Sequence, residues 1–192
     1  MGTAPVRTRR WTRVEYERLI DRGIFRDDER LELLDGVIVC REPQGDPHAA
    51  AVDLIAAALR RAFGEGWLVR AHGGVALDRR SRPEPDAYVV PGSPRDYRNA
   101  APTRPALVVE VSESRLGFDR TRKAALYARA GVEDYWIVNL VDRVLEVRRD
   151  PARLDIPGRR WGYRSVASLG PAEGVTPLAA PQDVILVADL LP

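Results

Sequence analysis

The stretch Ala-Leu-Val-Val-Glu-Val-Ser at residues 106–112 decides how the rest of the sequence is interpreted. Its nearly continuous apolar run predicts a strand over 106–111, of the kind that is buried in the centre of a sheet. Alternation along a strand places Glu110 on the same face as Val108 and Ser112. A carboxylate in such surroundings is costly unless it is paired, protonated or bound to a metal ion. The alternative is an edge strand on which Glu110 faces water.

A second acidic residue, Asp86, begins another apolar run, 86–90, directly after Pro85. On its own, Pro-Asp is a common turn sequence, so a plain turn residue is the alternative interpretation. Two acids at the ends of neighbouring strands, however, are what an oxygen-preferring divalent cation needs. Asp86 and Glu110 are therefore the first candidates for a metal site.

The helix expected over 118–130 carries the only lysine among the 30 basic residues of the chain. Lysine and arginine differ in shape, hydration and donor geometry, so a lone lysine marks a position where arginine does not serve. At 100° per residue, one stripe of this helix consists of Asp119, Lys123, Leu126, Tyr127 and Ala130. We interpret Lys123 as pointing along the buried face towards the sheet. The alternative is a surface ion pair with Asp119, worth about 0.3–0.5 kcal/mol.

The remaining elements surround these segments. Thr12 and Glu15 form a capping box that predicts a helix ending near Gly23. The pair Asp35-Gly36 between two apolar runs predicts a β-hairpin over 31–40. A further helix is expected over 48–63, and strands over 67–71, 75–77, 135–140, 144–148 and 184–187. This order of helices and strands predicts an α/β fold with a mixed sheet.

Composition narrows the class of protein. A chain of 192 residues, 45% of them hydrophobic, suits one domain with a substantial core. The net charge of +2 does not by itself require a nucleic-acid partner. Cys40 is the only cysteine, and no apolar run is long enough to span a membrane, so we expect a cytoplasmic protein without a membrane partner. Phosphate-loop, dinucleotide-binding and zinc motifs are absent, which leaves carboxylates, Lys123 and His48 to carry chemistry.

Five segments together resemble successive blocks of one protein family. They are RLELLDGVIV (30–39), PQGDPH (43–48), PDAYVV (85–90), VVEVSES (108–114) and FDRTRKAALYARAGVEDYWIV (118–138). The ordered set is similar to the Uma-type restriction endonucleases, within the PD-(D/E)XK nuclease superfamily. The resemblance implies a restriction-endonuclease-like fold, a mixed β-sheet core flanked by helices. We expect a single domain over 1–192, in which a helical arm at 1–28 and a β-rich extension at 150–192 flank these segments.

The resemblance also implies an active site. The superfamily motif corresponds to Pro85-Asp86, then Glu110, with its lysine displaced onto the following helix as Lys123; Ser112 stands where the ordinary motif has lysine. Asp86, Glu110 and the carbonyl of Val111 would hold Mg²⁺ or Mn²⁺. Lys123 would position the attacking water, and Asp119 would orient Lys123.

Two further residues have open roles. Glu32 either adds a metal or water contact from the first hairpin or faces solvent. His48 either shuttles a proton or contacts phosphate, or is an ordinary histidine at the start of a helix.

The function that the resemblance implies is Mg²⁺-dependent endonucleolytic cleavage of DNA. The alternative is a nucleic-acid-binding or interaction module on the same fold with little or no catalysis, since a fold does not guarantee an activity. Candidate DNA contacts are Arg79, Arg80 and Arg82 in the loop before Asp86, and a basic arm with Arg7, Arg9, Arg10 and Arg13. Their alternative is a solvated surface. A homodimer is compatible with this interpretation.

Overall fold

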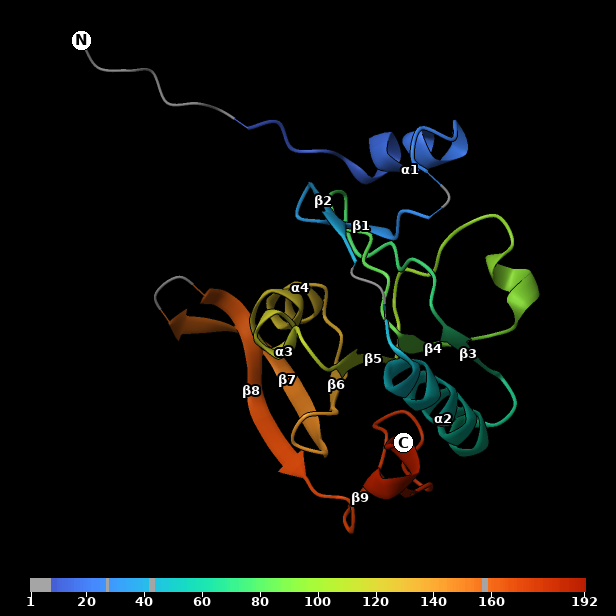
Figure 1. Cartoon of the computed structure of the whole chain (residues 1–192), viewed down its shortest axis with the longest axis vertical. Coiled ribbons are helices and arrows are strands. Elements are labelled where there is room, and N and C mark those ends of the chain that lie inside the picture. Colours follow the sequence, from blue (N-terminus) through green and yellow to red (C-terminus); the bar gives the residue numbers. More distant parts are fainter. Residues whose placement is uncertain (1–7, 27, 42–43, 157–158) are drawn as a thin grey trace.

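The computed structural model describes residues 8–26, 28–41, 44–156 and 159–192. Its centre is a six-stranded sheet in the order β3-β4-β5-β6-β7-β8 (Figure 1). The strands are β3 (Trp67–Ala71), β4 (Ala87–Pro91), β5 (Leu107–Ser112), β6 (Asp134–Asn139), β7 (Val144–Ile156) and β8 (Arg159–Leu169). Only β5 and β6 run parallel, and every other neighbouring pair is antiparallel. The predicted α/β fold with a mixed sheet is confirmed.

Helices cover both faces of this sheet. Helix α2 (Asp46–Phe63) packs on one face, and α3 (Leu116–Phe118), the π-helical turn η2 (Asp119–Lys123) and α4 (Ala124–Arg129) form one continuous helical segment on the other (Figure 1). The chain's last elements, β9 (Gly174–Val175), β10 (Ile185–Leu186) and the 3₁₀ turn η3 (Val187–Leu190), join the α2 side of the core. No helix in the described ranges is both long and apolar enough to cross a membrane.

Alternation along β5 divides the core into two clusters. Leu107, Val109 and Val111 pack in the cluster that contains α2. Val108 packs in the cluster that contains α4, and Glu110 lies on this second face, where Lys123 and Tyr127 of the helical segment contact it. With β4 and β6 on either side, β5 is a central strand, so the alternative of a water-facing Glu110 is excluded.

An N-terminal layer lies above the sheet in Figure 1. It consists of α1 (Arg13–Asp21) and the hairpin of β1 (Leu31–Leu34) and β2 (Val37–Cys40). The capping box of Thr12 and Glu15 and the hairpin turn are present as predicted. Gly36 has φ +76°, and a Cβ there would approach the carbonyl oxygen of Trp11 to 2.9 Å, so glycine is required at this position. The N–H of Trp11, two residues before α1, donates to the carbonyl of Gly36 at 2.9 Å and holds the turn against this segment.

Several sequence predictions need correction. The run 75–77 is not a strand, because the N–H groups of Val75 and Ala76 donate to the carbonyls of Pro83 and Pro102 rather than to a neighbouring strand. Helix α2 begins two residues earlier than expected, at Asp46. The strand expected over 144–148 continues to Ile156 and pairs with the long β8, which was not predicted. Asp150, with φ +59°, and Pro151 interrupt the alternation of apolar and polar residues, so this alternation does not predict the full strand.

The end of the chain differs too. The strand expected over 184–187 is reduced to the two residues of β10, followed by η3. The helix expected over 118–130 is present, but its middle is a π turn rather than a regular α-helix.

Candidate active site

The pairing of β4 with β5 brings the two predicted acids together. Ala87 is opposite Val109 in the antiparallel register, so one step further along places Asp86 opposite Glu110 on the same face of the sheet. The N–H of Val111 donates to Oδ2 of Asp86 at 2.8 Å, which fixes this carboxylate against β5. Both acids are 2% exposed, so Asp86 is not an ordinary surface turn residue.

Three side chains converge on the other oxygen of Asp86. Arg41 Nη2 and Gln44 Nε2 donate to Oδ1 at 2.5 and 3.0 Å. Nε2 of His48, from the first turn of α2, lies 3.3 Å from the same oxygen. Burial raises the pKa of the Asp86 carboxyl, but His48 and Arg41 outweigh this effect and hold the pKa well below its usual value. Asp86 is therefore ionised at neutral pH.

Glu110 has the opposite electrostatic environment. Its Oε1 accepts from Lys123 Nζ at 2.9 Å and from the hydroxyl of Tyr127 at 2.6 Å. Burial raises the pKa of Glu110 to about 8, since the lowering effect of Lys123 is offset by the charges of Asp86, Asp119 and Glu32. Two carboxylates opposite each other thus have pKa values shifted in opposite directions.

Lys123 points inward, as its place on the apolar stripe predicted. It is 4% exposed, and its ammonium lies 2.9 Å from Oε1 of Glu110 and 3.4 Å from Oε2 of Glu32. Burial lowers the pKa of Lys123, but Glu110 and Glu32 more than compensate and raise it above its usual value. The alternative of a surface ion pair with Asp119 is excluded, because Asp119 is also buried. The direct contacts that orient the ammonium come from Glu110 and Glu32, and Asp119 acts on it as a nearby charge.

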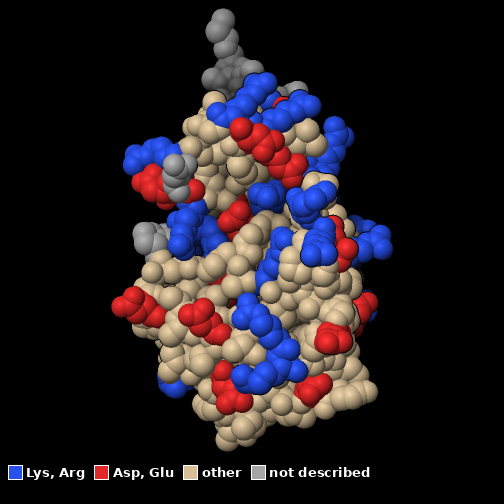
Figure 2. Space-filling view, turned by 90° about the vertical axis from the view of Figure 1, so that its right-hand side faces the viewer, with Lys and Arg blue, Asp and Glu red and all other residues tan. Residues whose placement is uncertain are grey.

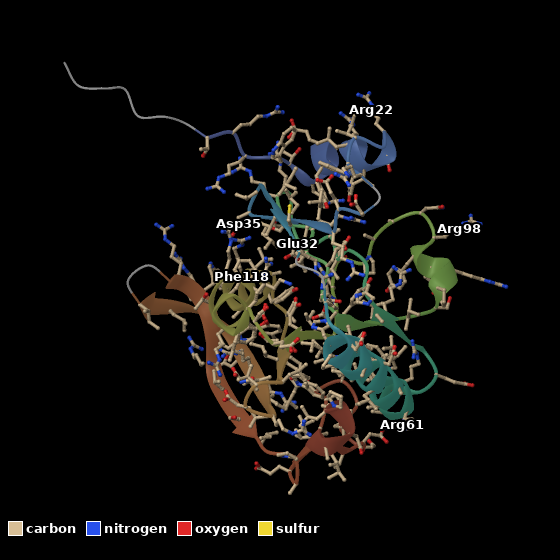
Figure 3. The ribbon with its side chains drawn as sticks, viewed as in Figure 1. Arg22, Glu32, Asp35, Arg61, Arg98 and Phe118 are labelled. Carbon is tan, nitrogen blue, oxygen red and sulfur yellow. The ribbon has the colours of Figure 1, made fainter. Side chains whose placement is uncertain are left out.

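Glu32 is part of this cluster rather than a solvent-facing hairpin residue. It is 1% exposed, and its Oε2 also accepts from the N–H of Glu84 at 3.2 Å. Figure 3 shows it below the hairpin, between that layer and the helical segment that begins near Phe118. The first hairpin therefore contributes a carboxylate to a site that is otherwise built on the sheet and the helix.

The π turn places Asp119 and Lys123 one above the other on the inner side of the helical segment. A π turn widens the helix by one residue and is frequent at functional sites. The hydroxyl of Tyr135, on β6, donates to the carbonyl of Asp119 at 3.1 Å and holds this turn against the sheet. Burial raises the pKa of Asp119 to about 6, against the lowering effect of Lys123.

A cavity of about 80 Å³ opens between these groups. Its lining includes Asp86, Glu110, Val111, His48 and Lys123, together with Arg41 and Gln44 from the segment before α2. Nε2 of His48 is buried there beside Oδ1 of Asp86 and has no further polar partner in the described part of the chain. Within the same part, no cluster of three or more His, Cys, Asp or Glu side chains is arranged to hold a metal ion, so a cation here would rely on two acids and backbone or water oxygens.

The predicted DNA contacts lie elsewhere. Arg79 and Arg80 are exposed, and their carbonyls accept from the N–H groups of Arg13 and Gly36, at the turn end of the hairpin. Arg82 is half-buried and lies 3.5 Å from Glu17, so its side chain is committed to the fold. None of these three lines the cavity.

The predicted basic arm is engaged within its own layer. Arg9 and Arg13 pair with Glu15 and Glu17, and Arg10 donates to the carbonyl of Asp35. Arg7 lies outside the described residues.

Sequence reasoning missed three residues of the site. The sequence pattern gives no sign of the contacts that Arg41 and Gln44 make with Asp86, although Gln44 stands in one of the segments that carry the resemblance. Periodicity places Tyr127 only on the apolar stripe of the helix, yet its hydroxyl donates to Glu110. Its spacing of one helical turn from Lys123 was the available signal.

The α/β fold thus holds a buried cluster of carboxylates and one lysine at the ends of two central strands. The model of the Uma2 family, described as "Putative restriction endonuclease", matches residues 13–179, and the chain belongs to this family. A solved structure from Anabaena variabilis, titled as a putative nuclease belonging to DUF820, is similar over 93% of this chain and 96% of that one, with 16% identity and a TM-score of 0.66. This likeness supports the fold. No curated protein matches the chain.

Proposed function

We propose that this chain is a Mg²⁺- or Mn²⁺-dependent endonuclease that hydrolyses phosphodiester bonds of DNA. The observation that carries the proposal is the charge of the buried cluster. Four carboxylates, Glu32, Asp86, Glu110 and Asp119, are at most 5% exposed. Their buried cationic partners are Lys123 and Arg41. When all six groups are ionised, two negative charges remain, which one divalent cation would neutralise.

Burial is the main cause of the raised pKa values of Glu110 and Asp119, and the neighbouring carboxylates add to it. A buried carboxylate without a full complement of positive charge takes up a proton more readily than one in water. A bound divalent cation would replace the proton and favour the ionised form. The donor set fits such a cation, because Asp86, Glu110 and the carbonyl of Val111 offer the oxygen ligands that Mg²⁺ prefers. When bound, the ion polarises the scissile phosphate and lowers the pKa of a coordinated water.

The protein's own groups do the positioning. Lys123, held by Glu110 and Glu32, has donors available for an attacking water or for a phosphate oxygen that gains charge in the transition state. Tyr127 keeps Glu110 turned towards the cavity. His48, whose buried Nε2 lies 3.3 Å from Oδ1 of Asp86 and lines the cavity, is placed to contact phosphate or to carry a proton.

The nucleic acid would approach from outside the buried cluster. Figure 2 shows basic side chains gathered over the upper and middle parts of one face, around a hollow in which acidic side chains are visible. Arginines on such a surface would contact backbone phosphates and make binding dependent on salt. Arg79 and Arg80 are exposed and remain candidates for contacts at a distance from the cavity.

A cleavage assay distinguishes this proposal from the alternative function, a nucleic-acid-binding module without catalysis. Linear, supercoiled and single-stranded DNA and an RNA of the same sequence are incubated with Mg²⁺, Mn²⁺ or a chelator. We expect metal-dependent cleavage of DNA by the wild type and by Glu113→Gln, an exposed glutamate at the mouth of the same cavity. Glu110→Gln should lose the activity. DNA binding without cleavage under every metal condition would favour the binding module, and cleavage of RNA alone would reassign the substrate.

A further inference from the structure

Strand β8 leaves one edge of the six-stranded sheet open. In the sheet order it is the last strand, and its only pairing among the described residues is with β7 (Figure 1). All five residues from Arg164 to Ser168 are exposed, including Val166 at 54%. Side chains alternate between the two faces of a strand, so the exposure of five consecutive residues means that both faces are uncovered here. The outer edge of β8 is uncovered too, because no other strand pairs with it among the described residues.

The opposite edge of the sheet is different. In β3, only Ala71 is exposed, and Trp67 packs against Phe63 of α2. Proteins protect open edges with charged residues, proline or a covering segment, because unpaired N–H and C=O groups can pair with another strand. The sequence Ser165-Val166-Ala167-Ser168 has none of the charges or prolines that would provide such protection.

We propose that a second copy of this chain pairs with β8 through this edge, antiparallel and around a two-fold axis at Val166. A two-fold axis makes the interface isologous, so one strand supplies both halves. In this register Val166 faces Val166 of the second copy, and Ser165 faces Ala167. The two six-stranded sheets then continue into each other. The proposal concerns assembly and is independent of the proposed nuclease function.

The side chains favour a copy of the same strand as the occupant. Ser165 and Ala167 are small, so the backbones can approach to hydrogen-bonding distance along the centre of the interface. Arg164 falls opposite Ser168, which avoids a pair of like charges, and in its own copy Arg164 is 3.6 Å from Asp150. Arg160 lies beyond the paired segment, on the side of the turn after β8 in the second copy, and Glu173 in that turn is an exposed residue of opposite charge.

The register predicts which substitutions matter. Residues directly opposite in an antiparallel pair have Cβ atoms about 4.5–5.5 Å apart, and like charges there are destabilising. The variant Ser165→Lys/Ala167→Lys would place two lysine pairs face to face. The variant Ser165→Lys/Ala167→Glu alters the same exposed positions but would form two lysine–glutamate pairs.

The test is the mass in solution across a wide range of protein concentration, measured by sedimentation equilibrium. We expect the wild type to reach twice its chain mass of 21.4 kDa, the lysine–lysine variant to weaken association by at least tenfold, and the lysine–glutamate variant to retain it. Circular dichroism checks that both variants are folded. A wild type that stays monomeric would overturn the proposal and leave the edge for a strand of another protein. A dimer that both variants leave unchanged would overturn it by placing the interface elsewhere.

Discussion

The two faces of the central sheet are built from the same strands but differ in what they bury. On the α2 face, β5 contributes Leu107, Val109 and Val111 to a cluster made only of hydrophobic residues. On the α4 face, the same strand contributes Val108 and then Glu110, which meets Lys123. Burial of apolar surface stabilises the first face. The buried charges of the second face contribute little net stability without a ligand, so their arrangement indicates function.

The largest effect is expected on the α2 face. Leu107 is fully buried there, and Leu107→Ala removes apolar contacts and leaves a cavity. We expect the free energy of unfolding to fall by about 2–5 kcal/mol, measured by urea denaturation. Leu54→Ala, on the exposed side of α2, is the control and should change it by less than about 0.5 kcal/mol. Equal losses in the two variants would contradict the assignment of this face as the main source of stability.

The next effect separates metal binding from folding on the α4 face. Mg²⁺ or Mn²⁺ at about 100 times its dissociation constant should stabilise the wild type by about 2.7 kcal/mol, because it binds only the folded state. Glu110→Gln should remove this gain and leave the metal-free protein at least as stable as the wild type, since a buried carboxylate is replaced by a neutral group. Thermal unfolding with and without metal measures both. A full metal-induced shift in the variant would place the ion elsewhere.

The effect of pH in the absence of metal is smaller for each pH unit. The pKa of Glu110 is raised from 4.5 to about 8, and burial is the main cause. Between these two values the folded state binds more protons than the unfolded state, so stability falls as pH rises through this window. The slope contributed by one such group is at most about 1.4 kcal/mol per pH unit. Urea denaturation at several pH values should show a steeper decline for the wild type than for Glu110→Gln; parallel curves would contradict the assignment.

The smallest effect is expected at the surface. Replacing Arg79 and Arg80 by alanine should make DNA binding less dependent on salt, because fewer counterions are then released when the complex forms. The slope of the logarithm of affinity against the logarithm of salt concentration should fall by about 0.9 for each phosphate that is no longer neutralised. Arg82 is left in place because it lies close to Glu17 and Glu84. Fluorescence anisotropy over a range of salt concentrations measures the slope. If it does not change, DNA is bound by other arginines.

The sequence alone predicts the strand that carries Glu110 and the inward direction of Lys123. In both cases local periodicity determines which side of an element is buried, and a charge on an apolar side is conspicuous. The sequence does not predict the place of Glu32 in the site, because a residue of the first hairpin reaches Lys123 only when the N-terminal layer packs against the sheet and the helical segment. The same holds for Arg41 and Gln44, whose contacts with Asp86 join segments more than 40 positions apart.

The long β7–β8 hairpin and the π turn were missed for local reasons. A proline and a residue with positive φ interrupt β7, so its alternation ends too early to predict the full strand. A helical period of 100° per residue assumes a regular α-helix and cannot predict the π turn over Asp119–Lys123, although Lys123 still faces inward. The hydrogen bond from Tyr135 to the carbonyl of Asp119 is a tertiary contact at this turn, and local periodicity does not contain it.

The most direct test of the account is metal-dependent DNA cleavage by Lys123→Arg, with Arg122→Lys at the neighbouring exposed position as control. Arginine keeps the positive charge beside Glu110 and Glu32, but its larger planar group cannot hold a water or phosphate oxygen at the same point. We predict that Lys123→Arg folds, binds metal and loses most cleavage, whereas Arg122→Lys cleaves like the wild type. Wild-type cleavage by Lys123→Arg would show that this lysine is not the catalytic one.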